Sequence, residues 1–483
     1  MKKTLKSVLL LTAVAMTGCG STVQAATKSD STRQPNIIYI NTDDWGIGKV
    51  PAYGFDNARN TLIKTPNLDQ LAADGMRFTN AYAGSAVCGP SRCSLLTGRH
   101  PGHAIWRENS KKPPHQPWPP KEPMLGTVAR QAGYTTAAFG KVSAGGHDTP
   151  KNITGYGWDY WLGFLGHIDC RDYYSPTIWE NGKQISLPAN NPETLKGTEL
   201  VKKGNGVVGE GKGTFIEDLY ADKIIEFITA NKDKPFFVYF ASTVPHGGQP
   251  GGLRVPALEG YDQHENLSRA EQVYCAMLTR HDRNVGRIRQ TVEKLGLADN
   301  TIILWTSDNG DEDSYYKRTD TFDGNGPYRG VKRSLYEGGI RVPLIAWWPG
   351  HLKPGDTCPL PTTQWDLMPT IAEAGNLPAA AYMDGISILP TLRGKPERQA
   401  RREYLYWEFG GSQQAVRMGN WKAYRKGGPD NPIELYRLDL DVGERRDVAD
   451  QHPDIVAKVE KIMREEHTFH PNSPKINQTA KEK

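Results

Sequence analysis

The sequence predicts an α/β protein with a mostly parallel sheet sandwiched by helices, followed by a smaller antiparallel sheet with one helix. Short, uniformly apolar segments alternate with amphipathic ones along most of the chain, and polar clusters follow several of the apolar segments. Uniformly apolar strands are typical of parallel sheets that are covered on both faces. After about residue 395 the pattern changes to short aromatic segments separated by turns, as in a small antiparallel sheet.

Length and composition exclude several classes of protein. The chain has 483 residues, more than one average domain. Its 50 Gly and 34 Pro are too few for a collagen-like or disordered chain. The net charge is only +5 and long basic runs are absent from the sequence, so nucleic acid is not an expected partner.

The first 26 residues are expected to be a secretory signal outside the fold. Three lysines precede an apolar run over residues 8–16, which is too short to span a bilayer permanently. Residues 16–19 resemble a bacterial lipobox that would place a lipid on Cys19, and small residues ending at Ala25 offer an ordinary cleavage site. We therefore expect a protein exported by a bacterium, either periplasmic or anchored in the outer membrane as a lipoprotein.

The elements of the main domain, residues 35–395, follow from hydrophobic periodicity. We expect strands at 36–41, 135–139, 236–241, 302–306 and 342–348, and helices at 65–75, 127–132, 215–230 and 269–295. In the C-terminal subdomain, residues 396–470, we expect strands at 404–409, 415–418, 421–425 and 435–440 and a helix at 453–466. Residues 471–483 are expected to form a flexible tail.

Polar residues at the ends of four predicted strands indicate an active site. Asp43-Asp44, Lys141, Pro245-His246 and Asp308-Asn309 each follow an apolar strand. Ligands of open parallel sheets bind beyond the carboxyl ends of the strands. We therefore expect these acids, bases and amides to meet at one rim of the sheet.

The segment from Cys88 to Arg99 carries the most specific motif. Its start, Cys-Gly-Pro-Ser-Arg, followed by Thr-Gly-Arg, resembles the signature of the type I sulfatases of the alkaline-phosphatase superfamily, in particular bacterial arylsulfatases and polysaccharide sulfatases. The resemblance runs from about Pro35 to the end of the chain and implies hydrolysis of sulfate esters. It also implies that a maturation enzyme oxidises Cys88 to formylglycine. The alternative interpretation is an ordinary helix start with a buried thiol.

The position of Cys88 suits that chemistry. A hydrated formylglycine at a helix N-terminus would face partial positive charge and free N–H groups, which favour an oxyanion and a sulfate. Arg92 lies one turn further along and can neutralise and orient the nucleophile.

A second group of residues predicts a cation site. Asp43, Asp44, Asp308 and Asn309 offer hard oxygen ligands, which suit calcium or magnesium and not zinc. The resemblance implies a divalent ion, usually calcium, held by these residues together with position 88. The alternative is that these residues form ordinary turns.

Three more residues are assigned by the resemblance. Lys332, which precedes Glu-Gly-Gly-Ile-Arg-Val-Pro, and Lys141 are expected to bind the sulfate oxygens, and His246 and Lys332 to protonate the leaving group. Many family members have a histidine where this chain has Ser143, so the residue that replaces it stays open; His147 is one candidate.

Weaker motifs resemble a branch of polysaccharide sulfatases and suggest His103 and Arg107 as substrate-binding residues. The expected partner is then a sulfated carbohydrate. Two other functions remain open: a formylglycine-dependent hydrolase of phosphonates or phosphodiesters, and a non-catalytic lipoprotein that binds sulfated glycans.

Overall fold

The computed structural model describes residues 33–55, 60–109, 123–143, 148–196, 198, 206–247, 252–312 and 322–470. The expected signal with Cys19, the expected tail, and His147 lie outside these residues. Within the described ranges, none of the helices combines the length and the apolar character needed to cross a membrane.

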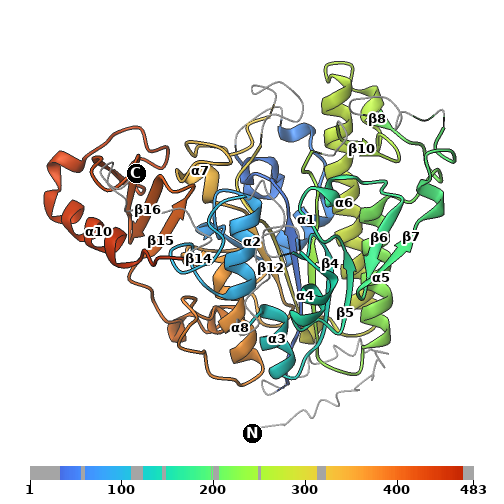
Figure 1. Cartoon of the computed structure of the whole chain (residues 1–483), viewed down its shortest axis with the longest axis horizontal. Helices are drawn as coiled ribbons and strands as arrows, with labels where there is room; N and C mark the ends of the chain where they lie inside the picture. The colour runs from blue at the N-terminus through green and yellow to red at the C-terminus, as the bar shows by residue number, and fades with distance from the viewer. Residues whose placement is uncertain are drawn as a thin grey trace, which may run out of the picture. The chain divides into compact units, whose positions relative to one another are not determined.

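A ten-stranded mixed sheet forms the centre of the main domain (Figure 1). Its order is β13-β2-β12-β11-β1-β9-β4-β5-β6-β7, and the five neighbours from β11 to β5 run parallel. The strands are β1 (Asn36–Thr42), β2 (Met76–Phe78), β4 (Thr135–Gly140), β5 (Tyr160–Gly163), β6 (Thr177–Glu180), β7 (Lys183–Ser186), β9 (Phe236–Ala241), β11 (Thr301–Ser307), β12 (Leu344–Trp347) and β13 (Asp356–Cys358). The predicted parallel centre is confirmed, whereas β12 pairs antiparallel to β11.

Helices cover both faces of this sheet. They are α1 (Pro66–Asp74), α2 (Cys88–Thr97), α3 (Leu125–Gln131), α4 (Pro150–Gly155), α5 (Ile216–Ala230), α6 (Arg269–Lys294), α7 (Glu337–Ile340), α8 (Leu367–Ala374) and α9 (Leu389–Leu392). Alternate residues of β1 enter two different cores: Ile38 and Ile40 pack with residues of α1, α5 and α6, while Ile37 and Tyr39 pack with residues of α2, α3 and α8. A strand buried on both faces must be apolar throughout, which explains the uniform sequence of β1.

The longest helix, α6, begins at a capping box. The Ser268 side chain accepts a hydrogen bond from the Glu271 backbone N–H, and the Glu271 side chain accepts one from the Ser268 N–H. These two bonds satisfy donors that a helix start otherwise leaves unpaired.

The C-terminal part forms a separate antiparallel sheet of four strands. Its elements are β15 (Leu405–Phe409), β16 (Gln413–Met418), β17 (Trp421–Lys426), β18 (Ile433–Arg437) and α10 (Pro453–Glu465). Val459 and Met463 of α10 pack on this sheet against residues such as Val416 and Leu435.

Two shorter pairs join β3 (Ala81–Tyr82) to β14 (Thr362–Thr363) and β8 (Gly206–Val207) to β10 (Arg254–Val255). The α/β class with a small antiparallel sheet is therefore as predicted.

A group of buried ion pairs connects α7 of the main domain to the C-terminal sheet. Glu337, the first residue of α7, lies 2.9 Å from Lys422 Nζ of β17 and 2.9 Å from Arg341 Nη1. Burial would raise the pKa of Glu337, but Lys422 and Arg341 lower it to about 2. Lys422 also lies 3.3 Å from Glu444, whose pKa is raised to about 7 by burial. Glu337 and Arg341 therefore brace the loop that carries Lys332.

We expect Lys422→Met to lower the free energy of unfolding by about 3 kcal/mol, because it leaves Glu337 buried without one of its cations. Thermal unfolding followed by circular dichroism measures this change. Lys461→Met, which removes an exposed lysine 3.9 Å from Glu465, serves as the control and should melt like the wild type. A Lys422→Met protein with an unchanged melting temperature would contradict the proposed bracing.

Candidate active site

The predicted acidic residues meet at the carboxyl ends of β1 and β11. Thr42 of β1 lies opposite Ser307 of β11 in the parallel register, so the residues that follow each strand are level. The Asp44 backbone N–H donates to Asp308 Oδ1 at 3.2 Å, and Asn309 Nδ2 donates to Asp44 Oδ1 at 2.7 Å. Asp44 adopts a φ of 68°, a left-handed conformation that is uncommon outside glycine.

This acidic group has oxygens that fit a divalent cation. One oxygen from each of Asp43, Asp44 and Asp308 lies within 4.8 Å of the others. Within the described part of the chain, Asp43 Oδ1 and Asn309 Oδ1 are buried and have no hydrogen-bond partner. Burial and the neighbouring Asp43 raise the pKa of Asp308 to about 7. Buried, unpaired oxygens on clustered carboxylates are the donor set that calcium or magnesium prefers.

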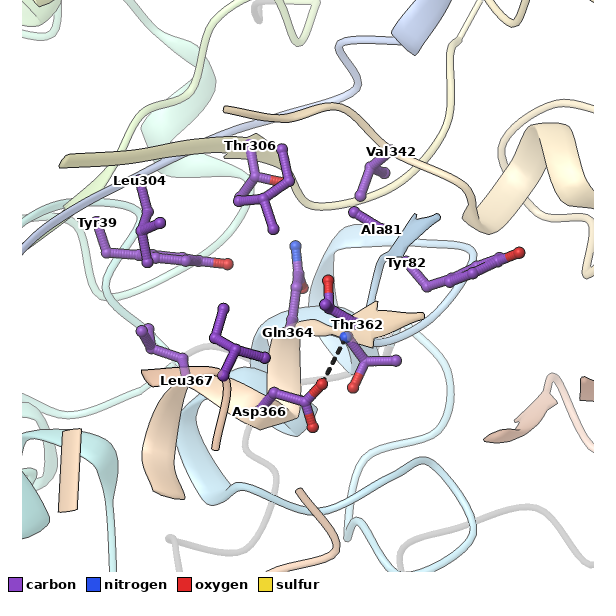
Figure 2. A pocket seen from close by; sticks show the side chains of 13 residues that line it. Tyr39, Ala81, Tyr82, Leu304, Thr306, Val342, Thr362, Gln364, Asp366 and Leu367 are labelled. Carbon is purple, nitrogen blue, oxygen red and sulfur yellow. Dashed lines mark hydrogen bonds between the residues drawn. The ribbon is translucent and has the colours of Figure 1, made fainter. Parts of the chain in front are cut away.

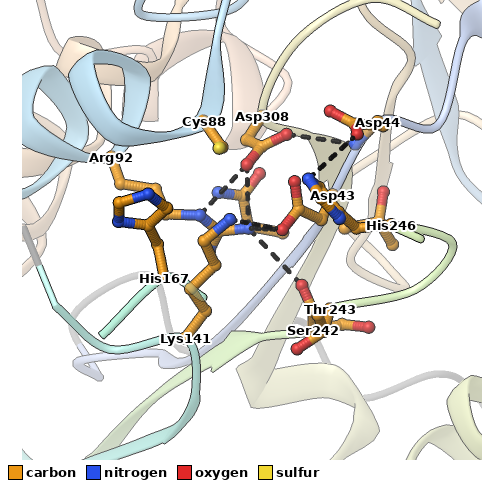
Figure 3. A network of polar contacts seen from close by, with 12 residues as sticks. Asp43, Asp44, Cys88, Arg92, Lys141, His167, Ser242, Thr243, His246 and Asp308 are labelled. Carbon is orange, nitrogen blue, oxygen red and sulfur yellow. Dashed lines mark hydrogen bonds and ion pairs between the residues drawn. The ribbon is translucent and has the colours of Figure 1, made fainter. Parts of the chain in front are cut away.

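Three cationic side chains are paired with these acids, and Figure 3 shows two of them, Arg92 and Lys141. Lys141 Nζ lies 2.6 Å from Asp43, and Lys332 Nζ lies 2.6 Å from Asp44. Arg92 Nη2 lies 2.9 Å from Asp308 and 3.7 Å from Asp43. Burial would lower the pKa of each cation, but the carboxylates raise it above its ordinary value, so all three stay charged.

Cys88 is the first residue of α2 and is fully buried. Its sulfur lies within 4.8 Å of a carboxylate oxygen of Asp43 and a ring nitrogen of His246. The preceding residue, Val87, is extended and gives the helix no side-chain cap. The nucleophile expected from the sequence therefore stands at a helix N-terminus beside the paired acids and cations.

His246 also lies close to these acids and to Cys88. Its Nε2 lies 3.5 Å from Asp44 Oδ2, and its Nδ1 lies 3.0 Å from the Gly247 carbonyl oxygen. The Tyr173 hydroxyl donates to the His246 carbonyl oxygen at 2.7 Å and holds this turn. Burial and Lys332 lower the pKa of His246 to about 3, so the ring is neutral near pH 7 in this arrangement.

Gln364 braces the site and was missed in the sequence analysis. Its Oε1 accepts from Ser91 Oγ at 2.6 Å and from the Gly84 N–H at 3.2 Å. Its Nε2 donates to the Ser307 carbonyl oxygen at 2.8 Å and to Asn41 Oδ1 at 3.2 Å. Gln364 thus connects α2 to β1 and β11, the two strands that the acidic residues follow.

A small cavity lies beside Gln364 (Figure 2). Its volume is about 20 Å³, and Tyr39, Leu304 and Leu367 are among its lining residues. A space of this size holds about one water molecule. It is therefore too small for a sugar.

His167 is a further residue near the site. Figure 3 includes it in the network of polar contacts around the acids. It belongs to the loop after β5, where the Cys170 thiol donates to its carbonyl oxygen at 3.2 Å. Ser143, at the position where a histidine was considered, is buried. No motif marks His167 as a site residue in the sequence.

His103 and Arg107 have their observed contacts in other groups of residues. His103 Nδ1 lies 2.9 Å from Asp384 Oδ1. Arg107 is buried, and its Nη1 lies 2.6 Å from Glu408. Their binding of substrate stays a prediction, as does that of His147.

The fold and the site together define a hydrolase of the alkaline-phosphatase-like α/β class. The sulfatase family model matches residues 35–377, and a model described as the C-terminal part of N-sulphoglucosamine sulphohydrolase matches residues 329–468. The chain belongs to the sulfatase family and is a sulfuric ester hydrolase.

Relatives cover nearly the whole chain. An N-acetylgalactosamine-6-O-sulfatase of Bacteroides thetaiotaomicron is 31% identical over 96% of this chain and 99% of its own length. Human arylsulfatase A is 30% identical over 81% of this chain and 75% of its own. Among solved structures, Ps i-CgsB in complex with k-i-k-neocarrahexaose is 26% identical, with a TM-score of 0.74 over 93% of this chain and 96% of that chain.

The end of α10 generates a prediction about acid stability. Glu466 Oε2 lies 2.8 Å from His100 Nε2, and this hydrogen bond and one from Tyr404 lower the pKa of Glu466 to about 2, against burial. A carboxylate whose pKa is lower in the folded state stabilises the fold above its unfolded pKa of about 4.3. That stability is lost as the pH falls toward 2.

We therefore expect Glu466→Gln to flatten the loss of melting temperature between about pH 5 and pH 3. Thermal melts across this pH range measure the effect. Glu465→Gln removes the same charge from the exposed neighbouring residue and should keep the wild-type slope. Equal slopes for all three proteins would show that the Glu466 contact is not formed in solution.

Proposed function

We propose that the protein hydrolyses sulfate esters of a carbohydrate, using a formylglycine made from Cys88 and a divalent cation. The observation that carries this proposal is the position of Cys88, buried at the start of α2 within 4.8 Å of Asp43 and His246. The matured residue would supply a hydrated aldehyde as the nucleophile, and the cation, calcium or magnesium, would supply a Lewis acid. Asp43, Asp44, Asp308 and Asn309 would hold the cation, with position 88 as a further ligand.

The chain's own cations fit the binding of a sulfate group. Arg92, Lys141 and Lys332 are buried and charged, so they can neutralise negative charge on the sulfate oxygens without reorganising. Lys332 stays charged and can deliver a proton to the departing sugar oxygen. His246, which is neutral in the arrangement described, would act as a second donor once the negative charge of a bound sulfate raises its pKa. Gln364 holds α2 and the two strand ends in place, so these groups stay aligned.

The relatives favour a sugar as the substrate. The Bacteroides relative acts on N-acetylgalactosamine-6-sulfate according to its name, and Ps i-CgsB was solved with a carrageenan oligosaccharide. A phosphonate monoester hydrolase of Agrobacterium radiobacter shares the fold at 20% identity, which leaves phosphonates and phosphodiesters as the second candidate substrates. We also propose that the enzyme is exported to the periplasm or the outer membrane, because residues 1–26 have the composition of a signal.

The test compares initial rates on an aryl sulfate, an aryl phosphate and 6-sulfated N-acetylgalactosamine, for protein co-produced with a maturation enzyme. We expect sulfate esters to be preferred, and Cys88→Ser to lose turnover while its melting temperature stays close to that of the wild type. The mass of the peptide around position 88 reports formylglycine. A preference for the phosphate ester would support the second candidate. Unmodified, inactive Cys88 in protein from the native host would favour a glycan-binding lipoprotein.

The cation site generates a separate prediction. Chelator-treated protein should gain about 2.7 kcal/mol of stability when calcium is added at a hundred times its dissociation constant. Asn309→Ala removes one ligand oxygen and should weaken this gain, whereas Asp439→Asn, at an exposed position two residues after β18, should keep it. Calorimetric melts with and without calcium make the comparison. No shift with either calcium or magnesium would contradict the proposed site.

A further inference from the structure

We propose that Asn109 is an additional catalytic residue, whose side-chain amide donates a hydrogen bond to the reacting atom at position 88. Asn109 Nδ2 lies 3.6 Å from the Cys88 sulfur, within the range of a hydrogen bond to sulfur. The same side chain accepts a hydrogen bond from the Gly89 N–H through Oδ1 at 3.0 Å. The inference rests on the proposed function, because it assigns a role toward the nucleophile made from Cys88.

The second bond determines which end of the amide faces position 88. The Gly89 N–H is a donor at the start of α2, and Val87 supplies no side-chain cap for it. Asn109 therefore caps the helix from a later segment. If the amide were rotated by half a turn, its NH₂ group would meet the Gly89 N–H, donor against donor. Only the observed orientation satisfies both atoms, and it points the NH₂ group at position 88.

The chemistry of an amide suits this place. After oxidation of Cys88, oxygen stands where the sulfur was, and an N–H group aimed at it donates to that oxygen. A fixed neutral donor stabilises negative charge on a reacting oxygen and cannot itself gain or lose a proton near pH 7. Asp43 and His246, which also lie close to the Cys88 sulfur, are titratable and come from strand ends. Asn109 adds a donor from the segment after α2.

The alternative is that Asn109 only caps the helix, and two substitutions separate the roles. Asn109→Asp keeps an oxygen for the Gly89 N–H but has no N–H donor, whereas Asn109→Ala loses both. Glu108→Gln changes the exposed preceding residue and is the control. All proteins are matured in the same way, and the peptide mass around position 88 gives the formylglycine content, to which rates are normalised.

We expect kcat on an aryl sulfate to fall about 100-fold in both Asn109 variants, with a lower melting temperature only in Asn109→Ala. A second readout does not depend on turnover: hydroxylamine condenses with the aldehyde to an oxime and releases water. A donor on the aldehyde oxygen accelerates this addition, so oxime formation, followed by mass, should slow about tenfold in both variants. Glu108→Gln should match the wild type in every measurement.

Wild-type kcat and oxime rates in Asn109→Asp would overturn the proposal and leave Asn109 as a cap alone. If the wild type contains formylglycine but hydrolyses no sulfate ester, the proposed function fails while the oxime rates still decide the role of Asn109. A slower oxime rate in both variants would then support the contact by itself.

Discussion

The compensation of buried negative charge at the carboxyl end of the sheet is the constraint on which the rest of the site depends. Asp43, Asp44 and Asp308 are fully buried within a few ångströms of each other. Three like charges at this distance are unfavourable unless cations balance them. Arg92, Lys141 and Lys332 supply three positive charges against these three carboxylates, and the unpaired oxygens of Asp43 and Asn309 remain as donors that fit a metal ion.

In the proposed reaction the same three cations, which come from three different segments, would also bind the sulfate group. Each one is held on a carboxylate by a short ion pair, so its position is set before any substrate arrives. A preorganised cation stabilises charge on a sulfate oxygen without a cost of reorganisation at the moment of reaction. The parallel register of β1 and β11 makes this possible, because it brings residues 43 and 308 level although 265 positions separate Asp44 from Asn309.

Much of this arrangement could be predicted from the sequence, and the limits have a physical reason. The apolar runs of β1, β4, β9 and β11 and the polar residues after them are local signals, so the parallel sheet and its acidic rim follow from periodicity. The motif around Cys88 is also local. Gln364 and His167 gave no such signal, because their partners lie in distant segments that only the folded chain brings together. Asn109 ends a weaker motif from which only His103 and Arg107 were predicted as site residues. The short strands β5, β6 and β7 were missed for a related reason: their burial varies along the strand and depends on neighbours.

Two buried side chains near the site, Gln364 and Glu337, each contact partners on several elements. Gln364 joins α2 to β1 and β11, and Glu337 joins the loop of Lys332 to β17 through Arg341 and Lys422. A buried polar group is costly when one of its partners is missing. Loss of one contact of Gln364 or Glu337 therefore destabilises all the elements that this residue joins. The C-terminal sheet thus helps to hold the site in place. Through Lys422 and Glu337 it supports the loop that carries Lys332, and through that lysine it supports the charge balance on Asp44.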